Sequence, residues 1–217
     1  MQVRNLILLV ACQLISTTGS IVMVTLGGII GATLTTNKAL STLPLSMMVV
    51  AIAATTIPAT MLMRRVGRRK GFAIASVCGA IAVLLVILAL RQASFVLFIV
   101  AVMIFGINMA FTQQYRYAAA ESVSPNYIPR AVSFVLIGSI GGAFVAPELA
   151  TRGAHWVASA PHAGTMIVLF ASFLLQAALF FFLEEGREHD IYRESPSGRG
   201  LGEIIRQPLF IVAVLGG

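Results

Sequence analysis

Long uncharged stretches alternate with short charged ones along the chain. The uncharged stretches cover seven parts of the sequence: 5–37, 39–63, 71–90, 92–115, 131–147, 153–183 and 207–217. A bilayer core needs roughly 20 apolar residues in helical form, and the first six stretches reach or approach that length. A helix on a soluble core would show polar residues at every third or fourth position, and these stretches do not. The pattern predicts an all-α membrane protein with six transmembrane helices.

We expect these helices to form one bundle over residues 1–183, at about 6–30, 41–63, 71–90, 93–113, 131–150 and 164–183. The segment 184–207 holds six of the eight acidic residues, which is typical of a solvated linker between two membrane bundles. Another apolar stretch follows, but the few residues from Pro208 to Gly217 cannot cross a bilayer at a helical rise of about 1.5 Å per residue. We interpret 208–217 as the truncated start of a seventh helix, and we expect the chain to be either a fragment or the product of a truncated reading frame.

The basic residues predict an orientation for this topology. If the N-terminus is cytoplasmic, twelve of the fifteen Lys and Arg residues fall on the cytoplasmic side, and three fall outside: Lys38, Arg91 and Arg152. Cytoplasmic loops of membrane proteins carry such an excess of Lys and Arg. The net charge of +7 is therefore explained without a nucleic-acid partner. We expect a multi-pass protein of a bacterial inner membrane, with a cytoplasmic N-terminus and a cytoplasmic linker.

A basic sequence, Arg64-Arg65-Val66-Gly67-Arg68-Arg69-Lys70, separates the second and third expected helices. It resembles the loop signature of the major facilitator superfamily, Gly-x-x-x-Asp-Arg-x-Gly-Arg-Arg/Lys. Four residues match: Arg65, Gly67, Arg68 and Arg69. Thr60 replaces the first glycine and Arg64 replaces the aspartate. The resemblance implies a loop that switches between conformations, and the alternative is a basic turn that serves topology only.

Small residues recur along the fifth expected helix at Gly138, Gly142 and Ala146, followed by Pro147. Small residues four positions apart let two membrane helices approach closely. The pattern is similar to a motif of the same superfamily that ends in Gly-Pro and is associated with antiporters. The alternative is ordinary helix packing with a proline kink.

The order of these motifs extends the resemblance over nearly the whole chain. It implies the N-terminal half of a transporter, built as two inverted three-helix repeats and completed by a C-terminal six-helix half that this chain lacks. The implied function is secondary active transport of a small solute by alternating access, within which the fifth-helix motif points to an exporter or antiporter. The alternative is a truncated inactive remnant or a non-transporting membrane scaffold.

Two stripes of neutral polar residues lie within the apolar stretches. The first and fourth expected helices contribute three residues each: Gln13, Thr17 and Ser20, and Asn108, Thr112 and Tyr115. Residues three and four apart share a helix face. In the superfamily these two helices line the central cavity, so the resemblance implies that both stripes contact the substrate. The alternative is hydrogen bonding between helices, worth about 1 kcal/mol per contact.

The sequence offers little support for catalysis. It contains no HExxH motif, no pair of carboxylates within a span and no P-loop. We therefore expect a protein that is not an enzyme and that uses no cofactor and no metal. No charged residue falls at the middle of an expected helix, so this half is not expected to carry a proton relay. The expected partners are the lipid bilayer and a small-molecule substrate that forms hydrogen bonds or is amphipathic.

Overall fold

The computed structural model describes residues 3–153, 156 and 163–183. Every regular element within these residues is helical. Six helical segments are long and apolar enough to cross a membrane, which confirms the all-α membrane architecture. The expected linker at 184–207 and the expected helix start at 208–217 lie outside the described residues.

Three of the helices extend beyond both ends of the ranges that the apolar stretches indicate, and two others end slightly before them. The bounds of the helices are α1 Val3–Leu34, α2 Leu43–Val66, α3 Arg68–Arg91, α4 Phe95–Thr112, α5 Tyr115–Glu121, α6 Ile128–Gly153 and α7 Ala163–Phe181, with short 3-10 helices η1 at Lys38–Leu40 and η2 at Pro125–Tyr127. A helix satisfies its own backbone hydrogen bonds and can therefore continue through polar residues at the edge of the apolar stretch. Hydropathy marks only the apolar part.

The fourth expected helix, at 93–113, corresponds to α4, but the membrane crossing continues beyond it. The crossing consists of α4 and α5, with Gln113 and Gln114 between them. The Gln114 N–H bonds to the Phe111 carbonyl three residues earlier, at 2.9 Å. Its side chain donates to the Thr60 hydroxyl of α2 at 3.2 Å. The tighter turn redirects the chain, so Tyr115 begins a new helix.

A single residue, Gly67, separates α2 from α3. Its φ angle is 86°, in the region that side chains other than glycine rarely adopt. The following helix starts at Arg68, three residues before the expected boundary at 71. Of the basic residues of the expected loop, Arg64 and Arg65 therefore lie in the last turn of α2, and Arg68, Arg69 and Lys70 lie in the first turn of α3.

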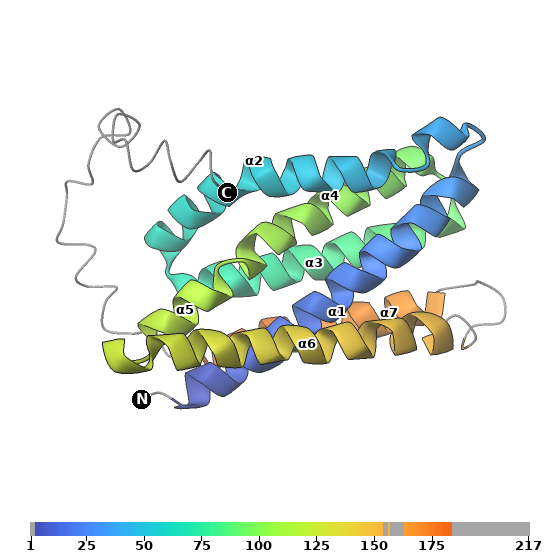
Figure 1. Ribbon diagram of the computed structural model, residues 1–217. Coiled ribbons are helices and arrows are strands. Elements are labelled where there is room, and N and C mark those ends of the chain that lie inside the picture. The colour runs from blue at the N-terminus through green and yellow to red at the C-terminus, as the bar shows by residue number, and fades with distance from the viewer. Residues whose placement is uncertain (1–2, 154–155, 157–162, 184–217) are drawn as a thin grey trace. The chain divides into compact units, whose positions relative to one another are not determined.

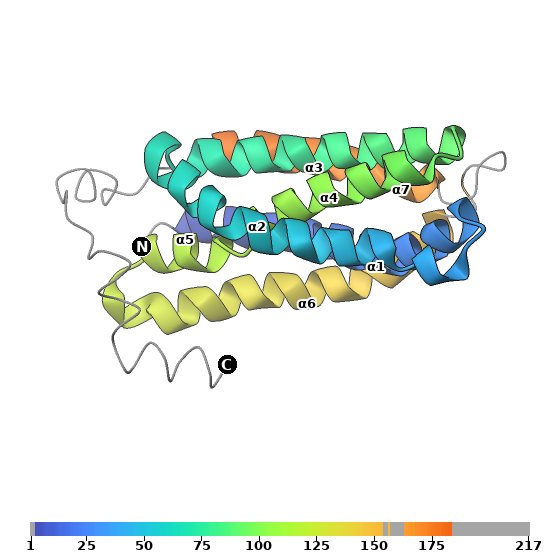
Figure 2. The same ribbon diagram turned by 90° about the horizontal axis from the view of Figure 1, so that it is seen from above.

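Figure 1 shows α2 and α6 along opposite edges of the bundle. Helix α1 packs against α6, and α2 packs against α4. Helix α3 packs against both α4 and α7, and it runs beside α7 in Figure 2. In their most apolar windows, only 17% of α2 and 22% of α6 is buried, against 44% of each other span. These two edge helices therefore have the largest unpartnered surface.

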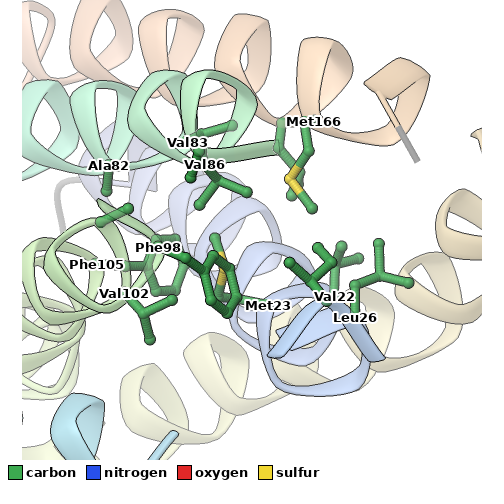
Figure 3. Close-up of a cluster of buried hydrophobic side chains, with 14 of the residues drawn as sticks. Val22, Met23, Leu26, Ala82, Val83, Val86, Phe98, Val102, Phe105 and Met166 are labelled. Atoms are coloured by element: carbon green, nitrogen blue, oxygen red, sulfur yellow. The ribbon is translucent and has the colours of Figure 1, made fainter. Parts of the chain in front are cut away.

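Buried apolar side chains form two separate clusters along the bundle. The first gathers residues from α1, α3, α4 and α7, including Met23, Val86 and Phe105, and Figure 3 shows these side chains meeting. The second surrounds the rings of Phe72, Tyr115 and Phe180, which contact one another in edge-to-face and tilted arrangements. Buried polar residues lie between the two clusters.

Candidate substrate-binding site

Buried polar residues separate the two apolar clusters. On each of the helices α1, α3, α4 and α7, they lie between the residues of one cluster and the residues of the other. We call these residues the polar layer: Gln13, Ser16, Thr18, Ser76, Asn108 and Gln176. None carries a charge. Neutral polar groups inside a membrane bundle need hydrogen-bond partners, because lipid offers none. The partners of each group therefore indicate what it does.

Gln13 joins α1 to α6. Its Nε2 donates to Ser139 Oγ of α6 at 2.9 Å and to Thr17 Oγ1 at 3.2 Å. Its Oε1 is buried and has no hydrogen-bond partner within the described residues. The structure thus brings two residues of the first predicted stripe together. The third, Ser20, donates to the Ser16 carbonyl within α1 at 2.8 Å.

The second predicted stripe points elsewhere. Asn108 is buried, and its Nδ2 donates to the Ala75 carbonyl of α3 at 2.7 Å. The Thr112 hydroxyl donates to the Asn108 carbonyl at 3.2 Å. Tyr115 is fully buried. The structure does not bring this stripe to Gln13, because Asn108 and Tyr115 face α3 and α7 instead.

A hydrogen-bonded network connects α1, α5 and α7. Gln176 Nε2 donates to the Tyr115 hydroxyl at 2.6 Å and to Ser16 Oγ at 3.0 Å, while the Ser16 hydroxyl lies 3.3 Å from Gln176 Oε1. All three side chains are buried. Sequence reasoning missed Ser16, Ser139 and Gln176. An isolated glutamine in an otherwise apolar span was the available signal for Gln176.

The glycines of α6 lie directly against α1. A Cβ atom on Gly138 would lie 2.5 Å from the Val10 carbonyl oxygen, and one on Gly142 would lie 2.6 Å from the Leu14 carbonyl oxygen. Ala146 is buried in the same row. Pro147 is exposed. The glycine and alanine positions thus form the contact face, which Ser139 borders.

Two residues of the switch loop, Arg68 and Arg69, contact partners that are distant in sequence. Arg68 at the start of α3 forms an ion pair with Glu121 at the end of α5. The Arg69 guanidinium lies 5.8 Å from the ring centre of Phe181 in α7. Arg65 is exposed. The residues after Gly67 therefore connect α3 to two other helices at one end of the bundle.

The described residues contain no group of three or more His, Cys, Asp or Glu side chains that could hold a metal ion. The two cysteines, Cys12 and Cys78, are not joined in a disulfide. The chemistry that this arrangement offers is hydrogen bonding by neutral side chains. Such groups can bind and orient a molecule through hydrogen bonds.

Two curated proteins are similar to this chain in sequence. The chain is 31% identical over 215 residues to a riboflavin transporter of Brucella anthropi, and the matched region covers 99% of this chain and 54% of that protein. The chain is 25% identical over 183 residues to an uncharacterized transporter of major facilitator type from Bacillus subtilis, and the matched region covers 83% of this chain and 43% of that protein. The chain thus spans about half the length of the curated relatives it matches. No solved structure matches it.

The profile described as Major Facilitator Superfamily matches residues 7–217, nearly the whole chain. Its range includes all of the described helices except the first residues of α1. The profile covers nearly the whole sequence, and the structure has six helical segments that are long and apolar enough to cross a membrane. The chain therefore belongs to the major facilitator superfamily.

Proposed function

We propose that this chain is the N-terminal half of a secondary transporter that moves a small solute across a membrane by alternating access. The observation that carries the proposal is the superfamily match over residues 7–217 in a bundle whose interior contains a neutral polar layer. A second six-helix half of similar length would complete the protein, since the relatives are about twice as long. The two halves would enclose the substrate near the middle of the membrane.

The proposed membrane is the bacterial inner membrane, with the N-terminus in the cytoplasm. This orientation rests on the excess of Lys and Arg at the end of the bundle that carries Arg68. The glycine row of α6 favours an exporter or antiporter within the class. Solute movement would then depend on rocking of one half against the other. Each half would consist of two inverted three-helix repeats.

The substrate that fits best is neutral and forms hydrogen bonds. The polar layer contains no charge that could compensate a charged solute, and burying an unpaired charge is costly. Riboflavin is the first candidate, because the relative from Brucella anthropi is a riboflavin transporter. We propose that Gln13, Thr17, Ser20 and Thr112 contact the substrate. Asn108 and Tyr115, whose polar groups bond to other helices, would instead support the site.

Transport of labelled riboflavin tests this proposal. We expect proteoliposomes that contain the full-length protein to accumulate or release riboflavin faster than empty liposomes, with saturation at high concentration. Unlabelled riboflavin should compete, and a charged analogue such as the phosphorylated flavin should compete poorly. A full-length protein that is folded but moves neither riboflavin nor other neutral solutes would favour the scaffold or inactive remnant instead.

The ion pair between Arg68 and Glu121 predicts a change in transport rate. Its side chains are about one third exposed, at 30% and 37%, and pairs with such exposure contribute up to about 1 kcal/mol. Arg68→Ala should therefore lower the maximal transport rate by about two- to fivefold and leave KM unchanged. Exposed Arg65 provides the matched control, and Arg65→Ala should transport like the wild type.

Glu121→Gln should repeat the effect of Arg68→Ala, and combining both changes should add little. Additive losses in the double variant would show that the two residues act separately. An unchanged rate in Arg68→Ala would return the basic residues to a role in topology alone.

A further inference from the structure

One buried polar atom in the described residues has no partner. Gln13 is 8% exposed, and its Oε1 accepts no hydrogen bond. The other members of the polar layer are paired: Thr18 with the Leu14 and Gly142 carbonyls, Ser76 with the Phe72 carbonyl, and Asn108, Ser16 and Gln176 as described above. An unsatisfied buried acceptor costs about 1–3 kcal/mol. Gln13 is therefore the exception in a layer that is otherwise satisfied.

Turning the Gln13 amide over does not remove the problem. The hydroxyls of Ser139 and Thr17 both donate and accept, so either amide atom can face them. With the amide reversed, Oε1 would accept from the hydroxyls, and Nε2 would take the unpartnered position. One polar end of this side chain thus lacks a partner in either orientation.

The surroundings of Gln13 favour a ligand over a structural role. Thr17 and Ser139, which hold the amide from α1 and α6, are both half-buried, so the site borders accessible surface. The close contact of Gly138 and Gly142 with α1 keeps the two helices in register around it. A side chain oriented by two hydrogen bonds, with its remaining polar end free, is prepared to bind a partner.

We propose that Gln13 Oε1, in the amide orientation that the structure shows, recognises the solute by accepting a hydrogen bond from a neutral N–H or O–H group. This inference rests on the proposed function and deepens it. Ser139 is a positioning residue that holds the amide, and Thr17 also holds it in addition to its proposed contact with the substrate. The matching ligand is an uncharged molecule with an amide, imide or hydroxyl group, such as the imide edge or the side-chain hydroxyls of riboflavin.

Gln13→Leu and Gln176→Leu form a matched pair of variants for the test. Both exchange a buried glutamine of the polar layer for leucine, but only Gln176 is fully paired. In the full-length protein, we expect Gln13→Leu to raise the KM for riboflavin about three- to tenfold, which corresponds to one lost hydrogen bond. Its melting temperature should stay close to that of the wild type, because the removal of the unsatisfied acceptor offsets the loss of two hydrogen bonds to Ser139 and Thr17. Both hydroxyls are only half-buried and can bond instead to a backbone carbonyl of their own helix. Ser139→Ala should raise KM less.

Two flavin probes identify the donor group. One is methylated at the imide nitrogen, and the other is lumiflavin, which lacks the side-chain hydroxyls. The probe that lacks the recognised donor should have a lower affinity than riboflavin for the wild type. For Gln13→Leu, the affinities of this probe and of riboflavin should be equal. If both probes lose the same affinity in the wild type and in Gln13→Leu, the inference is wrong although riboflavin transport stands.

The melting temperature separates this inference from the choice of substrate. If the wild type moves no riboflavin, the proposed substrate fails, but the stability of Gln13→Leu still decides the role of the amide. A melting temperature several degrees below the wild type would show that Gln13 supports the fold, directly or through a buried water, and would overturn the inference. An unchanged or higher value would support a ligand-binding group.

Discussion

Gly142→Ala is expected to destabilise the bundle strongly, although it adds only one methyl group. The new Cβ would lie 2.6 Å from the Leu14 carbonyl oxygen, 2.9 Å from Thr17 Cβ and 3.0 Å from the Thr18 nitrogen. Two of these atoms belong to the backbone of α1 and cannot move aside as a flexible side chain would. Helix α6 would have to shift away from α1, which costs about 1–3 kcal/mol for an overpacked site.

Gly28→Ala is the matched control, since a Cβ at Gly28 of α1 meets no atom within 4 Å. Alanine favours a helix over glycine by about 0.5–1 kcal/mol, so this variant should be as stable as the wild type or slightly more stable. The measurement is the melting temperature and the yield of monodisperse full-length protein in detergent. Equal stability of Gly142→Ala and Gly28→Ala would contradict the close contact between α1 and α6.

Gln176→Leu is expected to cause the second large loss of stability. Leucine has a similar volume but cannot bond to Tyr115 and Ser16, which are 0% and 1% exposed. Each stranded buried group costs about 1–3 kcal/mol. Helices α1, α5 and α7 also lose the network that connects them. The melting temperature should fall clearly, in contrast to that of Gln13→Leu.

Adding Tyr115→Phe to Gln176→Leu should recover part of the lost stability, because it removes one of the stranded hydroxyls and keeps the ring in contact with Phe72 and Phe180. The measurement is a double-mutant cycle on the melting temperatures of the full-length protein. If the loss of melting temperature in the double variant equals the sum of the losses in the two single variants, the Tyr115 hydroxyl and the Gln176 amide do not depend on each other.

Sequence reasoning located the membrane crossings well and their ends less well. Apolar stretches such as 71–90 found α3, but the helix begins at Arg68, because a helix needs no apolar side chains to satisfy its backbone. The short helix α5 that follows α4 was not predicted. Gln114, just before α5, contacts Thr60 of α2, and spacing along the chain does not show a contact between residues so far apart.

The candidate site was only partly predictable. Gln13 and Thr17 were found by their spacing, and the structure joins them. The partner of Gln13 on α6, Ser139, could not be found in this way, since the two residues are 126 positions apart. Asn108 shared the helical spacing of a stripe but bonds to α3. Spacing shows which residues share a helix face, and it does not show what that face contacts.

The sequence by itself determined the six membrane crossings, the membrane class and the family motifs. Lipid acts on each helix separately and requires a long apolar stretch wherever the chain crosses, so local composition suffices. The tertiary structure alone decided how each helix is rotated and which polar groups meet. The physical reason is that the lipid-facing side of a membrane helix is as apolar as its packed side. The amphipathic signal that orients helices in soluble proteins is therefore weak, and only packing shows that Arg68 reaches Glu121 or that Gln13 reaches Ser139.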